Sequence, residues 1–404
     1  MKRRTEQDDI SKEYIDGNAF YGINALRGQS LFAVSDDKVD AKLIETMAWV
    51  KKACTMANYD CGLLENTIVQ AIITACEMIS EGRYDEQFIV NTIQGGGGTS
   101  FNMNMNEVIA NVALKILGYE KGRYDIVDPL KHVNLSQSTN DTYPTAINMA
   151  LFDKLDGLLS VINDFNQALR NKSREFSGIF RIGRTHLNSA LPITYEQNFN
   201  AYFSMFERDY ERIRRVRSDL LVVPLGGTMI GTGSGASDEY RQKVIEHLRK
   251  ISGLDVRACA NLSDGIQNVD IYATLSSALK ILALNLSKMA SDLRLMSADW
   301  HDDGERLSLP RQQLGSSFMP SKTNPVMPEL VNQVSFMVCG YDTAISIAAQ
   351  AGQLELNVFK PLISHCLFKS IDMMANAIGL FGRFCIEGLM ENESNLRLFF
   401  EHKV

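Results

Sequence analysis

The sequence predicts an all-α protein dominated by an elongated bundle of long helices. Three segments carry apolar residues at alternating spacings of three and four, which places these side chains along one face of a helix. The segments cover residues 147–169, 199–220 and 271–296. Alternating patterns of β-branched residues, which indicate strands, are scarce. The long helical segments therefore determine the predicted fold.

The third of these segments has apolar residues on several sides. Ile281, Leu282, Leu284 and Leu286 point in different directions around one helix. A single neighbouring helix could not cover all of them. We therefore expect a homo-oligomer whose chains share the helical core.

The remaining elements follow from local signals along the chain. Residues 1 to about 40 are mixed and rich in turns, and a helix is expected from about Lys42. Gly95 to Gly98 breaks the helical pattern, and no Gly-Lys-Ser/Thr follows to make a phosphate-binding loop. Two further helices are expected to begin near Pro328 and Pro361.

Composition excludes several function classes. The 404 residues include 41 basic and 48 acidic ones, so a net charge of −7 argues against a nucleic-acid partner. No apolar run approaches membrane-spanning length, and the charged first nine residues lead into no apolar segment of a secretory signal. The seven cysteines and six histidines are scattered without metal-ligand spacing. We expect a cytoplasmic protein with reduced thiols and no metal centre.

We expect three parts along the chain. Residues 1–140 form a mostly helical N-terminal domain, and residues 141–393 form the long-helix bundle domain, which carries the loop 315–325. Residues 394–404 are interpreted as the remnant of a shortened C-terminal domain.

Polar clusters fall at the ends or breaks of the predicted long helices. Each is expected to place hydroxyls, amides and free backbone N–H groups near a helix N-terminus, where anions bind favourably. The clusters are residues 97–100, 138–140, 183–186, 226–233 and 315–325. No nucleophile elbow Gly-x-Ser-x-Gly is present. The pattern favours a small dicarboxylate and proton abstraction beside a carboxylate, with stabilisation of the aci-carboxylate intermediate.

The loop 315–325 reads Gly-Ser-Ser-Phe-Met-Pro-Ser-Lys-Thr-Asn-Pro. Its glycine and prolines prevent a helix, while a lysine, an asparagine and adjacent hydroxyls offer chemistry. Composition alone leaves two interpretations open, an ordinary surface loop and a mobile loop that carries reactive groups.

This loop resembles the signature of the aspartase/fumarase superfamily. Three other stretches resemble further blocks of that superfamily, in the same order along about residues 20 to 395: Gly98–Ser100 with Asn102–Asn104, Ser136–Asp141 and Gly183–His186. Lys51-Lys52-Ala53 and Asn324–Glu329 are more similar to the aspartate ammonia-lyase branch than to the fumarases.

The resemblance implies roles for individual residues. Ser316 matches the general base, whose alkoxide would need stabilisation by Lys322 and by loop amides once water is excluded. His186 lies in a block that matches the site of the leaving amine, and Glu329 matches the carboxylate that the family pairs with that histidine.

The other matched positions bind substrate. Thr99, Ser138, Thr139 and the amide of Ser317 match the β-carboxylate site. Lys322, Asn324 and Thr185 match the α-carboxylate site, and Asn140 joins His186 at the amine.

The resemblance implies a cofactor-free lyase that interconverts L-aspartate with fumarate and ammonia. It further implies a homotetramer in which three chains contribute to each site. A fumarase, a lyase for an N-substituted aspartate, and a helical homo-oligomer without turnover are the alternatives. Two departures from the family pattern bear on them: Asn188-Ser189 replaces the usual Gln-Asp pair, and the chain stops at Val404, which is expected to affect loop closure.

Overall fold

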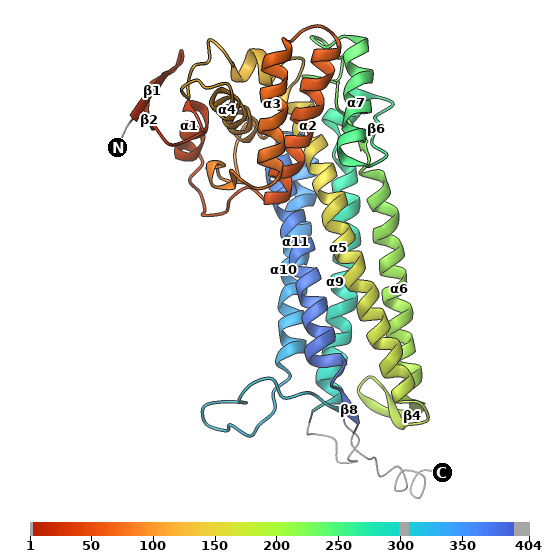
Figure 1. The fold of residues 1–404 in the computed structure, drawn as a ribbon. Helices are drawn as coiled ribbons and strands as arrows, with labels where there is room; N and C mark the ends of the chain where they lie inside the picture. Colours follow the sequence, from red (N-terminus) through yellow and green to blue (C-terminus); the bar gives the residue numbers. More distant parts are fainter. Residues whose placement is uncertain (1–2, 299–306, 392–404) are drawn as a thin grey trace, which may run out of the picture. The chain divides into compact units, whose positions relative to one another are not determined.

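A computed structural model describes residues 3–298 and 307–391, and these residues are mostly helical, which confirms the predicted all-α class (Figure 1). The α-helices are α1 (Ile23–Leu31), α2 (Ala41–Asp60), α3 (Asn66–Ser80), α4 (Thr99–Ile116), α5 (Thr139–Glu175), α6 (Tyr195–Asp219), α7 (Asp238–Ser252), α8 (Leu262–Gln267), α9 (Asp270–Met296), α10 (Val326–Gln350) and α11 (Lys360–Phe381). Short helical turns are η1 (Asp85–Gln87), η2 (Pro129–Val133) and η3 (Gly382–Ile386).

Strands occur only as short two-stranded pairs within the described residues. They are β1 (Arg3–Gln7) with β2 (Lys12–Asp16), β3 (Phe180–Thr185) with β4 (Asn188–Thr194), β5 (Val222–Val223) with β6 (Arg257–Ala258), and β7 (Leu307–Ser308) with β8 (Met390–Glu391). The pair β5–β6 is parallel and the other three are antiparallel. The three long segments predicted from apolar spacing correspond to α5, α6 and α9.

The described chain divides into two compact units. The first contains residues 3–154, 217–273 and 344–368, and the second contains residues 155–216, 274–298, 307–343 and 369–391. The division predicted at residues 140 and 393 stays a prediction, and residues 394–404 lie outside the described part of the chain. None of the helices in the described ranges combines the length and the apolar character needed to cross a membrane.

In the first unit, α2 is the central helix and contacts α3, α4 and α7. The apolar side chains of Met47, Val50 and Cys54 in α2 are fully buried, and the helix begins where the sequence predicted it, near Lys42. Ile72 of α3 and Ile109 of α4 are also fully buried, so these helices meet through close-packed side chains.

In the second unit, long helices lie side by side (Figure 1). The ring of Phe165 in α5 lies 5.2 Å from that of Phe206 in α6 and 6.0 Å from that of Phe381 in α11. Buried polar contacts add to this packing: Lys280 of α9 donates to the Asp342 carboxylate of α10 at 2.6 Å. Aromatic contacts and this nearly buried carboxylate therefore join the helices of the unit.

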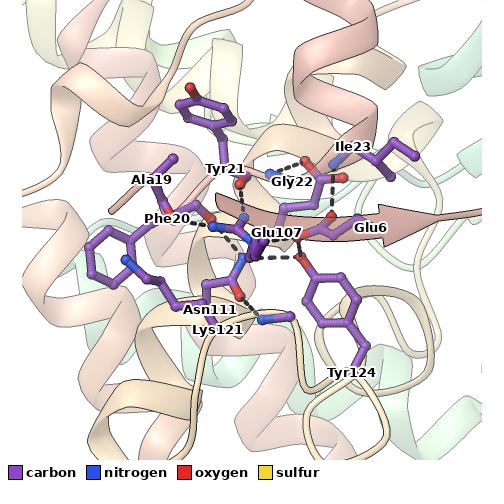
Figure 2. A network of polar contacts seen from close by, with 12 residues as sticks. Glu6, Ala19, Phe20, Tyr21, Gly22, Ile23, Glu107, Asn111, Lys121 and Tyr124 are labelled. Carbon is purple, nitrogen blue, oxygen red and sulfur yellow. Dashed lines mark hydrogen bonds and ion pairs between the residues drawn. The ribbon is translucent and has the colours of Figure 1, made fainter. Parts of the chain in front are cut away.

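Two buried carboxylates bind the N-terminus of α1 (Figure 2). Glu107 of α4 accepts hydrogen bonds from the backbone N–H groups of Gly22, Asn24 and Ala25 at 2.9, 2.8 and 3.1 Å. Glu6 accepts from the N–H of Ile23 at 2.9 Å. These groups are the donors that the first turn of α1 leaves without helical partners. The side chain of Glu107 therefore takes the place of an N-cap.

Burial raises the pKa of Glu107 to about 7, although the Asn24 and Ala25 N–H groups lower it. Between pH 4.5 and 7 the folded state then holds a proton that the unfolded chain has lost. The contribution of this proton to the unfolding free energy is complete below pH 4.5 and is lost as the pH rises to about 7.

We predict that Glu107→Gln removes this part of the pH dependence, because glutamine does not titrate. Urea unfolding at pH 5 and pH 7.5 measures this dependence. The difference in unfolding free energy between the two pH values should be smaller in the variant than in the unmodified protein. Glu65→Gln, an exposed glutamate before α3, is the control and should leave the difference unchanged. An unchanged difference in Glu107→Gln contradicts the prediction.

Candidate active site

The predicted site residues fall into two groups, one in each compact unit. The first unit contains Thr99 at the start of α4 and Ser138, Thr139 and Asn140 at the start of α5. The second unit contains Thr185 and His186 at the β3–β4 hairpin, and the loop and first helical turn that carry Ser316, Ser317, Lys322, Asn324 and Glu329. Each group therefore lies within one compact unit.

The first group is built at two helix N-termini that touch each other. Gly98 precedes α4 with φ 99°, and a Cβ atom there would lie 2.5 Å from the ring of Tyr143 in α5. Only glycine permits both the positive φ and this close approach. The Thr99 hydroxyl donates to the Gly96 carbonyl at 2.8 Å. The two N-termini present backbone N–H groups in one region, a setting that favours carboxylates.

The start of α5 forms a reciprocal capping arrangement. The Ser138 hydroxyl accepts from the backbone N–H of Asn140 at 3.1 Å, and Asp141 Oδ1 accepts from the N–H of Ser138 at 3.0 Å. Asp141 Oδ2 also accepts from the N–H groups of Gly226 and Thr228 at 3.2 and 2.9 Å. Burial raises the pKa of Asp141 to about 6, while these backbone donors lower it. The Ser-Thr-Asn block is thus part of the first turn of α5.

A buried lysine donates hydrogen bonds to the residues that precede this block. Lys51 of α2 is fully buried and donates to Asn134 Oδ1 at 2.9 Å and Gln137 Oε1 at 2.8 Å. Asn102 and Asn106 of α4 also donate to Asn134 Oδ1, at 3.2 and 3.1 Å. Burial lowers the pKa of Lys51 to about 8. Three side chains therefore donate to one amide oxygen, four residues before Ser138.

Sequence reasoning missed this supporting network. Lys51 contributed only to the family resemblance, although it follows Met47 by one helical turn within the apolar stripe of α2. A charged residue at such a position needs buried partners, and this was the available signal. Asn102 appeared only within a block that resembles the family, and the partner Asn134 could not be identified without the fold.

The second group includes a hairpin and corrects one expectation. The block 183–186 was expected near a helix N-terminus, but it forms the end of β3 and the turn into β4. Thr185 pairs with Asn188, so His186 and Leu187 make a two-residue turn with φ values of 53° and 64°. Glycine or asparagine usually occupies such positions, because the left-handed region is costly for other residues. The exposed His186 is therefore held in a strained turn.

The loop 315–325 closes on itself at its base. A Cβ atom at Gly315 would overlap the carbonyl of Lys322, and Asn324 Nδ2 donates to the Gly315 carbonyl at 2.5 Å. Within the loop, the backbone N–H of Met319 donates to Ser316 Oγ at 2.8 Å. This N–H is a loop amide of the kind expected to stabilise a serine alkoxide.

A cavity of about 590 Å³ adjoins this loop. Its lining includes Lys322, Asn324, Glu329 and Arg294. The carboxylate of Glu329 lies 3.9 Å from the Arg294 guanidinium. The predicted pairing of Glu329 with His186 stays a prediction, as do the roles of all matched residues.

We predict that Leu187→Gly raises the unfolding free energy by about 1 kcal/mol, because glycine adopts a positive φ without the cost that leucine has there. Thermal or chemical denaturation checks the change. Leu191→Gly, on the neighbouring strand β4, is the matched control and should destabilise, since glycine weakens a strand. A loss of stability in Leu187→Gly as large as that of the control would sink the interpretation of a strained turn.

Comparisons with known proteins agree with these features. A family model described as "Lyase" matches residues 16–340. An aspartate ammonia-lyase from Bacillus subtilis (strain 168) is 44% identical over 398 residues, which cover 98% of this chain and 84% of that protein. An aspartate ammonia-lyase from Escherichia coli (strain K12) is 38% identical over 393 residues, with coverage of 96% and 82%.

Solved structures share the fold. A "fumarate lyase:delta crystallin" from Brucella melitensis bound to cobalt is 40% identical, with a TM-score of 0.94 and coverage of 98% of this chain and 86% of that one. A class II fumarase from Schistosoma mansoni is 28% identical, with a TM-score of 0.93 and coverage of 99% and 87%.

Proposed function

Because the chain belongs to the fumarase and aspartase family of lyases, we propose that it is an ammonia-lyase that interconverts L-aspartate with fumarate and ammonia. Similarity to aspartate ammonia-lyases over nearly the whole chain supports the reaction. The observation that carries the proposal is the loop contact between the Met319 N–H and Ser316 Oγ, since it gives the proposed base a donor at the oxygen where charge develops.

In this mechanism Ser316 removes the proton from the carbon next to the β-carboxylate of L-aspartate. The electron pair moves onto that carboxylate and forms the aci-carboxylate, which carries an additional negative charge. Thr99, Ser138 and Thr139, at the N-termini of α4 and α5, are proposed to stabilise it. Collapse of the intermediate then breaks the carbon–nitrogen bond and releases ammonia and fumarate.

Lys322, Asn324 and Thr185 are proposed to hold the α-carboxylate. The amide of Ser317 is proposed to bind the β-carboxylate. Lys322 and Asn324 line the same cavity, which gives a dianion one cationic and one amide partner. His186 is proposed to act at the leaving amine with its ring oriented by Glu329. Ser316 is only partly exposed, whereas Ser317 and Phe318 are exposed, so closure over the substrate is needed to exclude water.

Two related substrates remain as alternatives under this proposal. Similarity to a class II fumarase makes L-malate the first to assay. Asn188-Ser189, on β4 next to the His186 turn, makes N-substituted aspartates the second. The different-class alternative, an oligomer without turnover, predicts binding of a dicarboxylate and no product.

We predict that Ser316→Ala lowers kcat for fumarate formation from L-aspartate by at least about a thousandfold, because the proposed base is lost. The ultraviolet absorbance of fumarate measures the rate. Ser321→Ala, in the same loop and outside the predicted site, is the matched control and should keep most of the activity. Equal rates for Ser316→Ala and the control would exclude Ser316 as the base, and no fumarate from the unmodified protein would remove the proposed activity.

The assembly is proposed to be a homotetramer with each site shared by three chains. The helices of the second unit expose large apolar side chains at Leu284, Phe336 and Met337, which are 52, 65 and 48% exposed. Such side chains on long helices fit a contact between copies of the chain.

We predict that Phe336→Glu lowers the oligomeric mass and, with it, the activity, because a charge would be buried at the contact between copies. Light scattering coupled to gel filtration measures the mass. Leu63→Glu, an exposed leucine between α2 and α3, is the control and should leave the mass unchanged. A tetramer that persists in Phe336→Glu places the contact elsewhere, and a monomeric unmodified protein contradicts the proposed assembly.

A further inference from the structure

The glycine-rich segment 226–233 has a defined conformation that the proposed chemistry does not yet use. Gly226, Gly231 and Gly233 have φ values of 91°, 85° and 71°, in the left-handed region that favours glycine. Thr228 adopts φ 56° without being glycine, and it is buried. A residue in this region persists only where its surroundings hold it there. The segment is therefore kept in one shape by its contacts.

Those contacts come from both sides of the segment. Asp141 Oδ2 holds the N–H groups of Gly226 and Thr228, while its Oδ1 holds the N–H of Ser138. The Ser263 hydroxyl donates to the Ile230 carbonyl at 3.0 Å, and a Cβ atom at Gly231 would overlap the backbone of Ser263. One carboxylate thus connects the segment to the substrate-binding block at the start of α5.

The segment also determines the orientation of the Asn140 side-chain amide. Asn140 Nδ2 donates to the Met229 carbonyl at 2.8 Å. A carbonyl oxygen can only accept, so the amide must direct its NH₂ group toward Met229 and its Oδ1 away. With its NH₂ group engaged by this carbonyl, the side chain offers Oδ1 as its acceptor. It is then suited to bind an N–H group and poorly suited to bind a carboxylate.

The residue that turns Asn140 also carries an exposed apolar side chain. Met229 is 66% exposed and the neighbouring Ile230 is 43% exposed. Both belong to a segment whose backbone is fixed, so their side chains leave it from defined positions. Methionine is flexible and adapts to the shape of a bound group. The backbone carbonyl of the same residue contacts the Asn140 amide, so the Met229 side chain begins close to that contact.

We propose that Asp141 and the segment 226–233 form the wall of the amine subsite: Asp141 and the Met229 carbonyl position Asn140 as an acceptor, and the Met229 side chain sets which amines fit. The inference rests on the proposed lyase function and deepens it.

In the amination direction the amine nitrogen forms a bond to one alkene carbon of fumarate while the π bond breaks. The other carbon takes a proton, and the added nitrogen loses one. With methylamine in place of ammonia, the same bond and proton changes would give N-methylaspartate.

The test compares ammonia and methylamine as amines with fumarate, using the full-length protein. We expect Met229→Ala to raise the methylamine-to-ammonia ratio of kcat/KM by about fivefold or more, because the pocket gains room for one methyl group. Met390→Ala, a similarly exposed methionine on β8, is the control and should leave the ratio unchanged. An unchanged ratio in Met229→Ala overturns the role of this side chain.

Asp141→Asn tests positioning, since an amide cannot accept from all three backbone N–H groups. We expect KM for ammonia to rise roughly tenfold and KM for fumarate to rise much less, because Asp141 accepts one N–H group from Ser138 and two from the segment that orients Asn140. A purely structural role would raise both KM values by the same factor, and that result overturns the positioning role. If Asp141→Asn does not fold, the Met229→Ala ratio still decides. No turnover by the unmodified protein overturns the proposed function itself, whereas turnover with an unchanged ratio overturns only this inference.

Discussion

The carboxylate of Asp141 joins the start of α5 to the segment 226–233 in the first unit. Its two oxygens accept from the backbone N–H groups of Ser138, Gly226 and Thr228, which belong to segments far apart in the sequence. The residue is fully buried, so no water can replace these contacts. Removal of the carboxylate would leave three buried donors without a partner. This would destabilise the segments that carry Ser138 and Asn140.

The same constraint governs Lys51 and Asn134. A buried ammonium group is acceptable only with acceptors around it, and the amides of Asn134 and Gln137 supply them. Asn102 and Asn106 bring α4 to the same oxygen. These buried hydrogen bonds connect α2 and α4 to Asn134 and Gln137, just before α5. They therefore help to fix the conformation of the chain at the start of α5.

Function in this fold depends on groups that are weakly held as well as on groups that are rigid. The Ser138 block is fixed by buried contacts, whereas the exposed His186 lies in a strained turn and the loop that carries Ser316 is open to solvent. Rigid helix N-termini suit the binding of a carboxylate, which needs the same geometry throughout the reaction. A serine that is proposed to lose its proton needs a site that excludes water only when substrate is present.

The helices were predictable from the sequence, because the spacing of Leu151, Leu155 and Leu158 within α5 reports a local geometry that needs no knowledge of distant contacts. The residues of the candidate site were also identified from the sequence, through blocks that resemble a known family. The block at Thr185 and His186 was placed wrongly near a helix N-terminus, because His-Leu is not a recognisable hairpin turn and only the pairing of β3 with β4 forces its φ values. Likewise, the partners of Asp141, the burial of Lys51 and the orientation of Asn140 by the Met229 carbonyl join residues that are distant in sequence. The sequence by itself determined which segments are helical and which residues are proposed to carry the chemistry. Only the tertiary structure decided how those residues are held, because a buried polar group takes its partner from whichever segment the fold brings within hydrogen-bonding distance.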